Sequence, residues 1–274
     1  MNAFEALVLG VVQGLTEFLP ISSTAHLRIV PALLGWADPG AAFTAVTQLG
    51  TVAAVVLFFR ADLLRIARAS VAVLRRPRAP WGPDARLGVM ITAGTIPIGI
   101  FGLAFKDQIE TGARDLKLIG VTLIVLGFVL LAAERVGRRE RDLADLRVGQ
   151  GLLIGVAQAV ALIPGVSRSG ATISAGLFLG LDRVAAARFS FLLSIPAVVL
   201  AGLFELKGIV DGSTTGPTPA LGVTALATLT AFGVGYASIA LLLRFLSTRS
   251  TAVFIAYRIA LGTLVLALVG AGVL

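Results

Sequence analysis

The sequence holds one short polar stretch, residues 164–172, inside an otherwise apolar run that extends over 152–181. This stretch contains one arginine, Arg168, and three hydroxyl side chains, Ser167, Ser169 and Thr172. An ionisable side chain inside a long apolar segment is costly to bury, so its presence indicates a functional site.

Helix-breaking residues predict how this stretch folds. Pro164 and Gly165 end one helix, and the serines are good N-caps for another that begins near Gly170. The free N–H groups at such a helix start favour an anion, and an arginine beside them recognises phosphate or carboxylate with two parallel hydrogen bonds. We therefore predict an anion pocket within a membrane, with Arg168 as its cation and Ser167, Ser169, Gly170 and Thr172 as ligands.

A second polar stretch near the N-terminus supplies an acid and a possible base. Gln13 and Glu17 lie one helical turn apart and face the same side. Glu17 is either a functional acid or a structural partner of Arg168 or Arg28. His26, the only histidine, is either a base or nucleophile, or a hydrogen-bonded core residue.

The hydroxyl residues Ser22, Ser23 and Thr24 lie between this acid and the histidine. They are helix caps, phosphate ligands, or nucleophiles activated by a base, and the spacing leaves these roles open. The attacking group is water activated by Glu17, a serine at 22 or 23, or His26, and direct participation by Ser23 or His26 is favoured. Glu17, with Gln13, could also offer oxygens to Mg²⁺ or Ca²⁺, although one carboxylate makes a weak site.

Composition determines the class of protein. The chain has 274 residues, of which 57% are hydrophobic and only 14% charged, and its mean hydropathy is +0.95. These values predict an all-α polytopic membrane protein. There are no cysteines, which excludes disulfides and cysteine chemistry. The net charge of +8 comes from arginines gathered between apolar segments, where they act as topology signals, so no nucleic-acid partner is expected.

Hydropathy predicts two kinds of membrane element. Two broken pairs, 3–19 with 24–34 and 148–163 with 170–181, have limbs too short to cross a core of about 30 Å, so each is expected to form a re-entrant hairpin. Full spans are expected at 43–59, 87–105, 116–133, 185–204, 220–243 and 251–273. The arginine-rich connection 60–86 is expected to be cytoplasmic, which places both termini outside.

An internal repeat relates the two broken pairs within a single membrane domain, 1–274. Gly10 and Gln13 align at a constant offset with Gly155 and Gln158, and the same offset pairs Ser22 with Ser167. Repeat 1 covers about 1–140 and repeat 2 about 148–274, each with one hairpin and three spans. An odd number of spans inverts the second copy, so the hairpins are expected to meet near the midplane. Glu17 aligns with Leu162 and Ser23 with Arg168, so one repeat supplies the acid and the other the arginine.

Two motifs resemble the undecaprenyl-diphosphate phosphatase family of the bacitracin-resistance (BacA) type. They are residues 13–26, QGLTEFLPISSTAH, and residues 164–172, PGVSRSGAT, and the resemblance covers nearly the whole chain. It implies a bacterial plasma-membrane enzyme that removes one phosphate from C55 polyprenyl diphosphate at a site facing outward, recycling the lipid carrier for cell-wall synthesis. Gln13 stands where many members have glutamate, which weakens any mechanism that needs two carboxylates on a divalent cation.

Three functions fit an anion pocket in a membrane: a phosphatase, a polyprenyl-phosphate transporter or flippase, and a lipid-phosphate binder. Inverted repeats with broken helices are typical of transporters. The enzyme is favoured because an acid, a histidine and hydroxyls are expected to converge with the arginine, whereas a carrier needs only the anion clamp. Chain-length preference, metal requirement and oligomeric state, including a homodimer, remain open.

Overall fold

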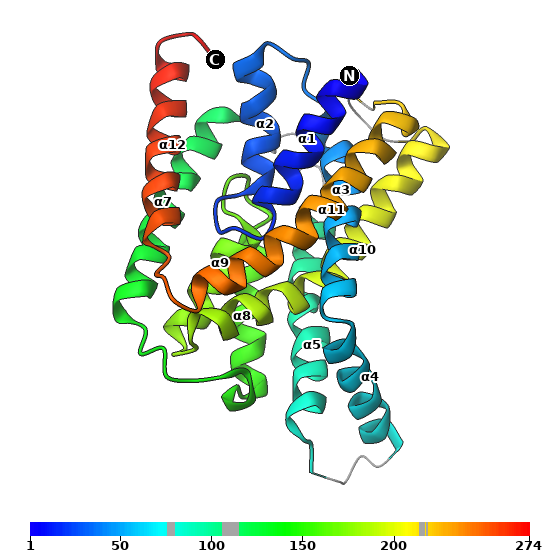
Figure 1. The fold of residues 1–274 in the computed structure, drawn as a ribbon, viewed down its shortest axis with the longest axis vertical. Helices are drawn as coiled ribbons and strands as arrows, with labels where there is room; N and C mark the ends of the chain where they lie inside the picture. Colours follow the sequence, from blue (N-terminus) through cyan, green and yellow to red (C-terminus); the bar gives the residue numbers. More distant parts are fainter. Residues whose placement is uncertain (76–79, 106–114, 214–216, 218) are drawn as a thin grey trace.

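The computed structural model describes residues 1–75, 80–105, 115–213, 217 and 219–274. Within these ranges the chain forms eleven α-helices and one short 3₁₀ helix, η1, and no named strand. The helices are α1 Ala3–Thr16, α2 Ser23–Leu34, α3 Gly40–Phe58, α4 Arg60–Arg75, α5 Pro83–Ala104, α7 Leu116–Val136, η1 Leu143–Asp145, α8 Val148–Val160, α9 Arg168–Phe178, α10 Arg183–Asp211, α11 Leu221–Leu246 and α12 Ala252–Gly270 (Figure 1).

Six of these helices are long and apolar enough to cross a membrane, and they coincide with the six predicted spans. They are α3, α5, α7, α10, α11 and α12. The prediction of an all-helical polytopic membrane protein is therefore confirmed. The connection 60–86, expected as a loop, contains the 16-residue helix α4, whose Ile66 side chain is buried, and residues 76–79 lie outside the described ranges.

The four limbs of the predicted broken pairs are short helices. They contain 14, 12, 13 and 11 residues in α1, α2, α8 and α9, which corresponds to about 16–21 Å each at 1.5 Å per residue. None of the four reaches the roughly 30 Å of a hydrocarbon core, as the sequence predicted.

Each pair is broken by a serine with an unusual backbone conformation. Ser22 has φ of 73° and Ser167 has φ of 72°, a region that residues other than glycine rarely adopt. Each side chain caps the next helix: Ser22 accepts from the N–H of Ala25 at 3.4 Å, and Ser167 from that of Gly170 at 3.1 Å. The two breaks are therefore built in the same way, and each leaves a helix start facing inward.

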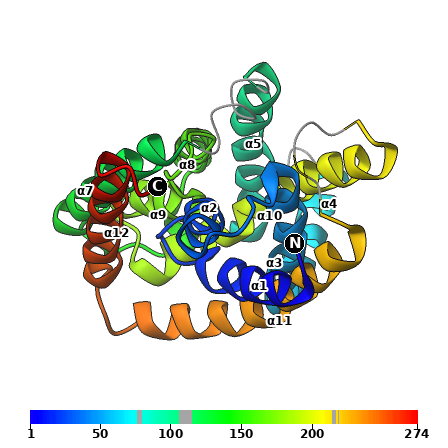
Figure 2. The ribbon, with the colours of Figure 1, turned by 90° about the horizontal axis from the view of Figure 1, so that it is seen from above.

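The four limbs pack against the larger helices. α1 packs against α11 and α8 against α5, while α9 contacts α7, α8 and α10. Seen from above, α2 and α9 lie near the centre, with the long helices around them (Figure 2). Irregular backbone at membrane depth is tolerated only where protein surrounds it, and here the long helices surround the two breaks.

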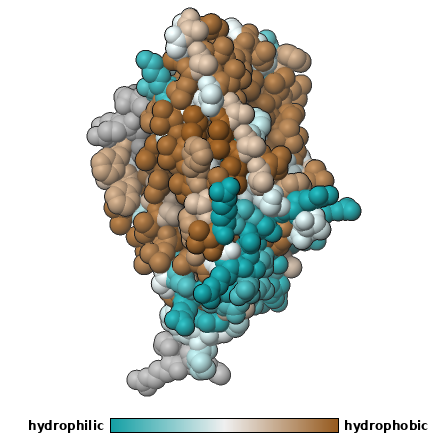
Figure 3. Space-filling model, turned by 90° about the vertical axis from the view of Figure 1, so that its left-hand side faces the viewer, coloured by the Kyte–Doolittle hydropathy of each residue, from teal (hydrophilic) through white to brown (hydrophobic). Residues whose placement is uncertain are grey.

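Polar and apolar side chains separate along the long axis of the molecule. Hydrophobic side chains cover most of the face formed by α7 and α12, while hydrophilic side chains gather towards its lower part (Figure 3). Exposed residues of α7 include Val121, Val125 and Phe128. Both termini lie at the end opposite to α4 and the start of α5, in agreement with the span count (Figure 1).

Candidate functional site

The two breaks meet through direct contacts between the N-terminal and C-terminal halves of the chain. The guanidinium of Arg168, the first residue of α9, forms an ion pair with the carboxylate of Glu17, which follows α1. The neighbouring Ser169 hydroxyl donates to the carbonyl oxygen of Leu19 at 3.0 Å. Residues 151 positions apart in the sequence thus form one polar cluster.

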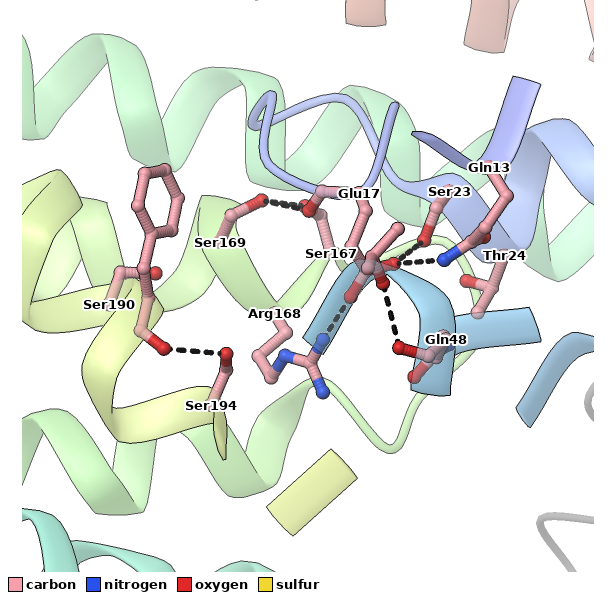
Figure 4. A network of polar contacts seen from close by, with 12 residues as sticks. Gln13, Glu17, Ser23, Thr24, Gln48, Ser167, Arg168, Ser169, Ser190 and Ser194 are labelled. Carbon is pink, nitrogen blue, oxygen red and sulfur yellow. Dashed lines mark hydrogen bonds and ion pairs between the residues drawn. The ribbon is translucent and has the colours of Figure 1, made fainter. Parts of the chain in front are cut away.

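Glu17 is the centre of this cluster. Its Oε1 accepts from Arg168, while its Oε2 accepts from the Ser23 hydroxyl at 2.6 Å and from the Gln13 amide at 2.8 Å (Figure 4). The Glu17 side chain is 5% exposed and that of Arg168 19% exposed, so the arginine forms the more accessible side of the pair. The short bond from Ser23 is typical of a hydroxyl that donates to a charged carboxylate.

Helix starts complete the cluster. α2 and α9 both begin at the breaks, beside the ion pair, and their first N–H groups have no partner within their own helices. Hydroxyl pairs line these starts: Ser22 with Thr24 at 3.2 Å, and Ser167 with Ser169 at 3.1 Å. Two helix starts and one arginine therefore surround the place where an anion could bind.

His26 is held away from the carboxylate. Its Nδ1 contacts the carbonyl oxygen of Ser22 at 2.7 Å, and its Nε2 contacts the hydroxyl of Tyr257 in α12, also at 2.7 Å. Both ring nitrogens therefore have partners, and neither partner is Glu17 or Ser23. An attack by His26 would first require one of these bonds to break.

Thr172 lies behind the cluster and not on its accessible side. Its hydroxyl donates to the carbonyl oxygen of Arg168 at 2.7 Å and contacts the Ser190 hydroxyl at 2.6 Å, and the residue is 1% exposed. The predicted substrate ligand is thus placed where it supports the first turn of α9. Beside Arg168 and Glu17, Figure 4 places Ser194 of α10 and Gln48 of α3, which the sequence did not indicate.

A buried arginine is the main residue that sequence reasoning missed. Arg258 in α12 is 0% exposed and donates to the carbonyl oxygens of Pro20 at 3.0 Å, Gly165 at 3.1 Å and Val166 at 3.0 Å. It also donates to two carbonyls of α7, those of Thr122 and Leu123. The rule that singled out Arg168, an arginine inside an apolar span, applies equally to Arg258.

The cluster provides few ligands for a divalent cation. Among the described residues, no three histidine, aspartate or glutamate side chains come together as a metal site. The Gln13 amide oxygen is buried without a hydrogen-bond partner, and it lies beside Glu17, whose oxygens are already bonded. These two residues fit a weakly held hard cation whose other ligands would be water and substrate oxygens.

The fold and this site define a class: a polytopic helical membrane protein with an arginine–glutamate–serine cluster at two helix starts. The chain belongs to the family described as bacitracin resistance protein BacA, which matches residues 6–264. It is 55% identical over 274 residues to an undecaprenyl-diphosphatase of Nocardioides sp., covering 100% of this chain and 99% of that protein. It is also 55% identical to the undecaprenyl-diphosphatase of Myxococcus xanthus, covering 99% of this chain and 91% of that protein.

Proposed function

We propose that this chain is a membrane phosphatase that hydrolyses undecaprenyl diphosphate to undecaprenyl phosphate and inorganic phosphate. The main support for this proposal is that Ser23, Glu17 and Arg168 come together between two helix starts. The relatives named undecaprenyl-diphosphatase support the substrate. A diphosphate on a lipid needs a cation, helix starts for its oxygens and a location within the bilayer, and this cluster offers all three.

In this proposal Ser23 is the attacking group. Glu17 Oε2 accepts the Ser23 proton while the serine oxygen bonds to the terminal phosphorus, and the bond from that phosphorus to the bridging oxygen breaks. The lipid leaves as its monophosphate, and the phosphate stays on Ser23. Glu17 passes its proton to the departing lipid phosphate and becomes a carboxylate again. A water then gives a proton to Glu17 and attacks the phosphoserine. The bond from phosphorus to the serine oxygen breaks, inorganic phosphate leaves, and Glu17 returns the proton to Ser23. Arg168 stabilises the charge on the transferred phosphoryl oxygens.

Glu17 and Gln13 are the residues that would hold Mg²⁺ or Ca²⁺ in this site. A bound ion would neutralise charge on the phosphate oxygens. Its remaining ligands would come from water and substrate, because Glu17 is the only carboxylate of the cluster as described.

We also infer that the two halves, 1–140 and 148–274, form an inverted repeat with two re-entrant hairpins in one domain. The matching conformations of Ser22 and Ser167 support this repeat. So does the packing of α1 on α11 and of α8 on α5, since each contact joins a limb of one half to a long helix of the other half.

Inverted repeats are common in transporters, so a polyprenyl-phosphate flippase that uses the same anion pocket is the second candidate function. A homodimer stays a prediction.

Phosphate release separates the two candidates. Detergent-purified protein incubated with C55 polyprenyl diphosphate is expected to release inorganic phosphate, and Glu17→Gln is expected to abolish the release because it removes the base. The glutamine variant also controls for contaminating phosphatases. Lipid translocation in vesicles without phosphate release would favour the flippase and contradict the enzyme.

We infer that the site opens towards the outer face of a bacterial plasma membrane, with α4 on the cytoplasmic side. The arginines of α4 and of the helix ends near it support this orientation. The chain has no cysteine, so single cysteines at Ala67 and Ser213, both exposed, can be labelled cleanly. An impermeant thiol reagent on intact cells is expected to label position 213 and not 67. The reverse pattern would overturn the orientation.

A further inference from the structure

We propose that Arg258 is a positioning residue for the reaction, which holds the two helix breaks at a fixed separation. Its Nη1 donates to the carbonyl oxygen of Pro20 in the first break, and its Nη2 donates to those of Gly165 and Val166 in the second. One planar guanidinium therefore joins both breaks. The positioning role of Arg258 rests on the proposed phosphatase function.

The surroundings of Arg258 are shaped to its guanidinium. The Thr122 hydroxyl of α7 donates to the carbonyl oxygen of Pro164 at 2.6 Å, so α7 holds the second break from the adjacent side. At Gly170, a Cβ atom would lie 3.0 Å from Arg258 Nη1, which lets the first turn of α9 approach the cation closely. The preceding residue in α12, Tyr257, bonds to His26, so two successive residues of one helix hold α2 and both breaks.

The charge of Arg258 is also unusual. Its side chain donates only to backbone carbonyls, and none of the ion pairs between described residues includes it. Carbonyl dipoles stabilise the buried cation without neutralising it. Because Glu17 and Arg168 neutralise each other, Arg258 leaves the region of the two breaks with a net positive charge that favours a bound anion.

A lysine cannot replace this arginine. Its ammonium is a single point on a flexible stem, whereas the guanidinium places donors on both breaks and α7 at once. If the breaks shift by about 1 Å, the attacking oxygen and the phosphorus lose their alignment, which costs about 100-fold in turnover. Arg258→Lys is therefore expected to reduce kcat by about 100-fold and to bind anions more weakly.

The control must destabilise α12 without touching the breaks. Thr251 is 0% exposed at the start of the same helix, where its hydroxyl donates to Glu134 at 2.8 Å. Thr251→Val removes this bond and should lower the Tm while leaving kcat close to that of the unmodified protein. Both variants are assayed at a temperature well below their own Tm, where a residue needed only for stability would show normal turnover.

Two measurements decide the proposal. Phosphate release gives kcat and KM, and the rise in Tm caused by inorganic pyrophosphate reports anion binding without catalysis. We expect Arg258→Lys to lose turnover and most of the pyrophosphate shift, while Thr251→Val retains both. Turnover within about threefold of the unmodified protein together with an intact shift would overturn the positioning role. If the unmodified protein releases no phosphate, the proposed function fails, and the pyrophosphate shift still decides the role of Arg258.

Discussion

Replacing Arg168 by lysine is expected to lower turnover by about 100-fold or more while leaving the protein folded. The guanidinium forms an ion pair with Glu17, and another of its nitrogens points away from Glu17 (Figure 4). A lysine keeps the charge but loses the planar arrangement that matches phosphoryl oxygens. Loss of one preorganised donor at a developing negative charge costs about 10²- to 10³-fold in turnover. Phosphate release under saturating substrate measures the effect.

The chain offers a matched control for this substitution. Arg183 at the start of α10 also forms an ion pair with a glutamate, Glu134, but it contacts neither break. Arg183→Lys is therefore expected to retain near-normal turnover. If Arg168→Lys behaves like Arg183→Lys, then Arg168 does not bind the transferred phosphate.

Replacing Ser23 by alanine is expected to lower turnover by at least about 10⁴-fold, because it removes the attacking oxygen. The bond of 2.6 Å from Ser23 to Glu17 singles out this hydroxyl among those at the two helix starts. Brief incubation with a diphosphate labelled at its terminal phosphate should leave label on the unmodified protein and none on Ser23→Ala. The adduct should resist acid, as phosphoserine does and phosphohistidine does not.

Ser174→Ala is the control for loss of a buried hydroxyl. Ser174 lies in α9 and donates only within its own helix, to the carbonyl oxygen of Gly170 at 2.7 Å. This variant should trap label normally. A rapid quench that traps no label, with inversion at phosphorus in a single turnover, would show direct attack by water. An acid-labile adduct would instead identify His26.

Much of the fold follows from composition and local pattern. Six apolar stretches predicted six spans because a helix must satisfy every backbone group where no water is available. The breaks in the two pairs of short helices could also be predicted, because proline, glycine and serine end and start helices through their local geometry. The motifs at residues 13–26 and 164–172 likewise contain Gln13, Glu17, Ser23 and Arg168, although not Gln48 and Ser194 beside them.

Only the tertiary structure decided how those residues are paired. Spacing favoured Ser23 or His26 as the attacker but left Ser22 and water possible, because it does not show which hydroxyl faces the carboxylate. The fold places Ser23 on Glu17 and turns both His26 nitrogens towards other partners. The sequence could indicate Arg258 as an arginine inside an apolar span, but it could not indicate the partners of Arg258, because these are backbone carbonyls from three distant segments. Side-chain chemistry can be read along the chain, but contacts between main chain and side chain across the fold depend on how the helices pack.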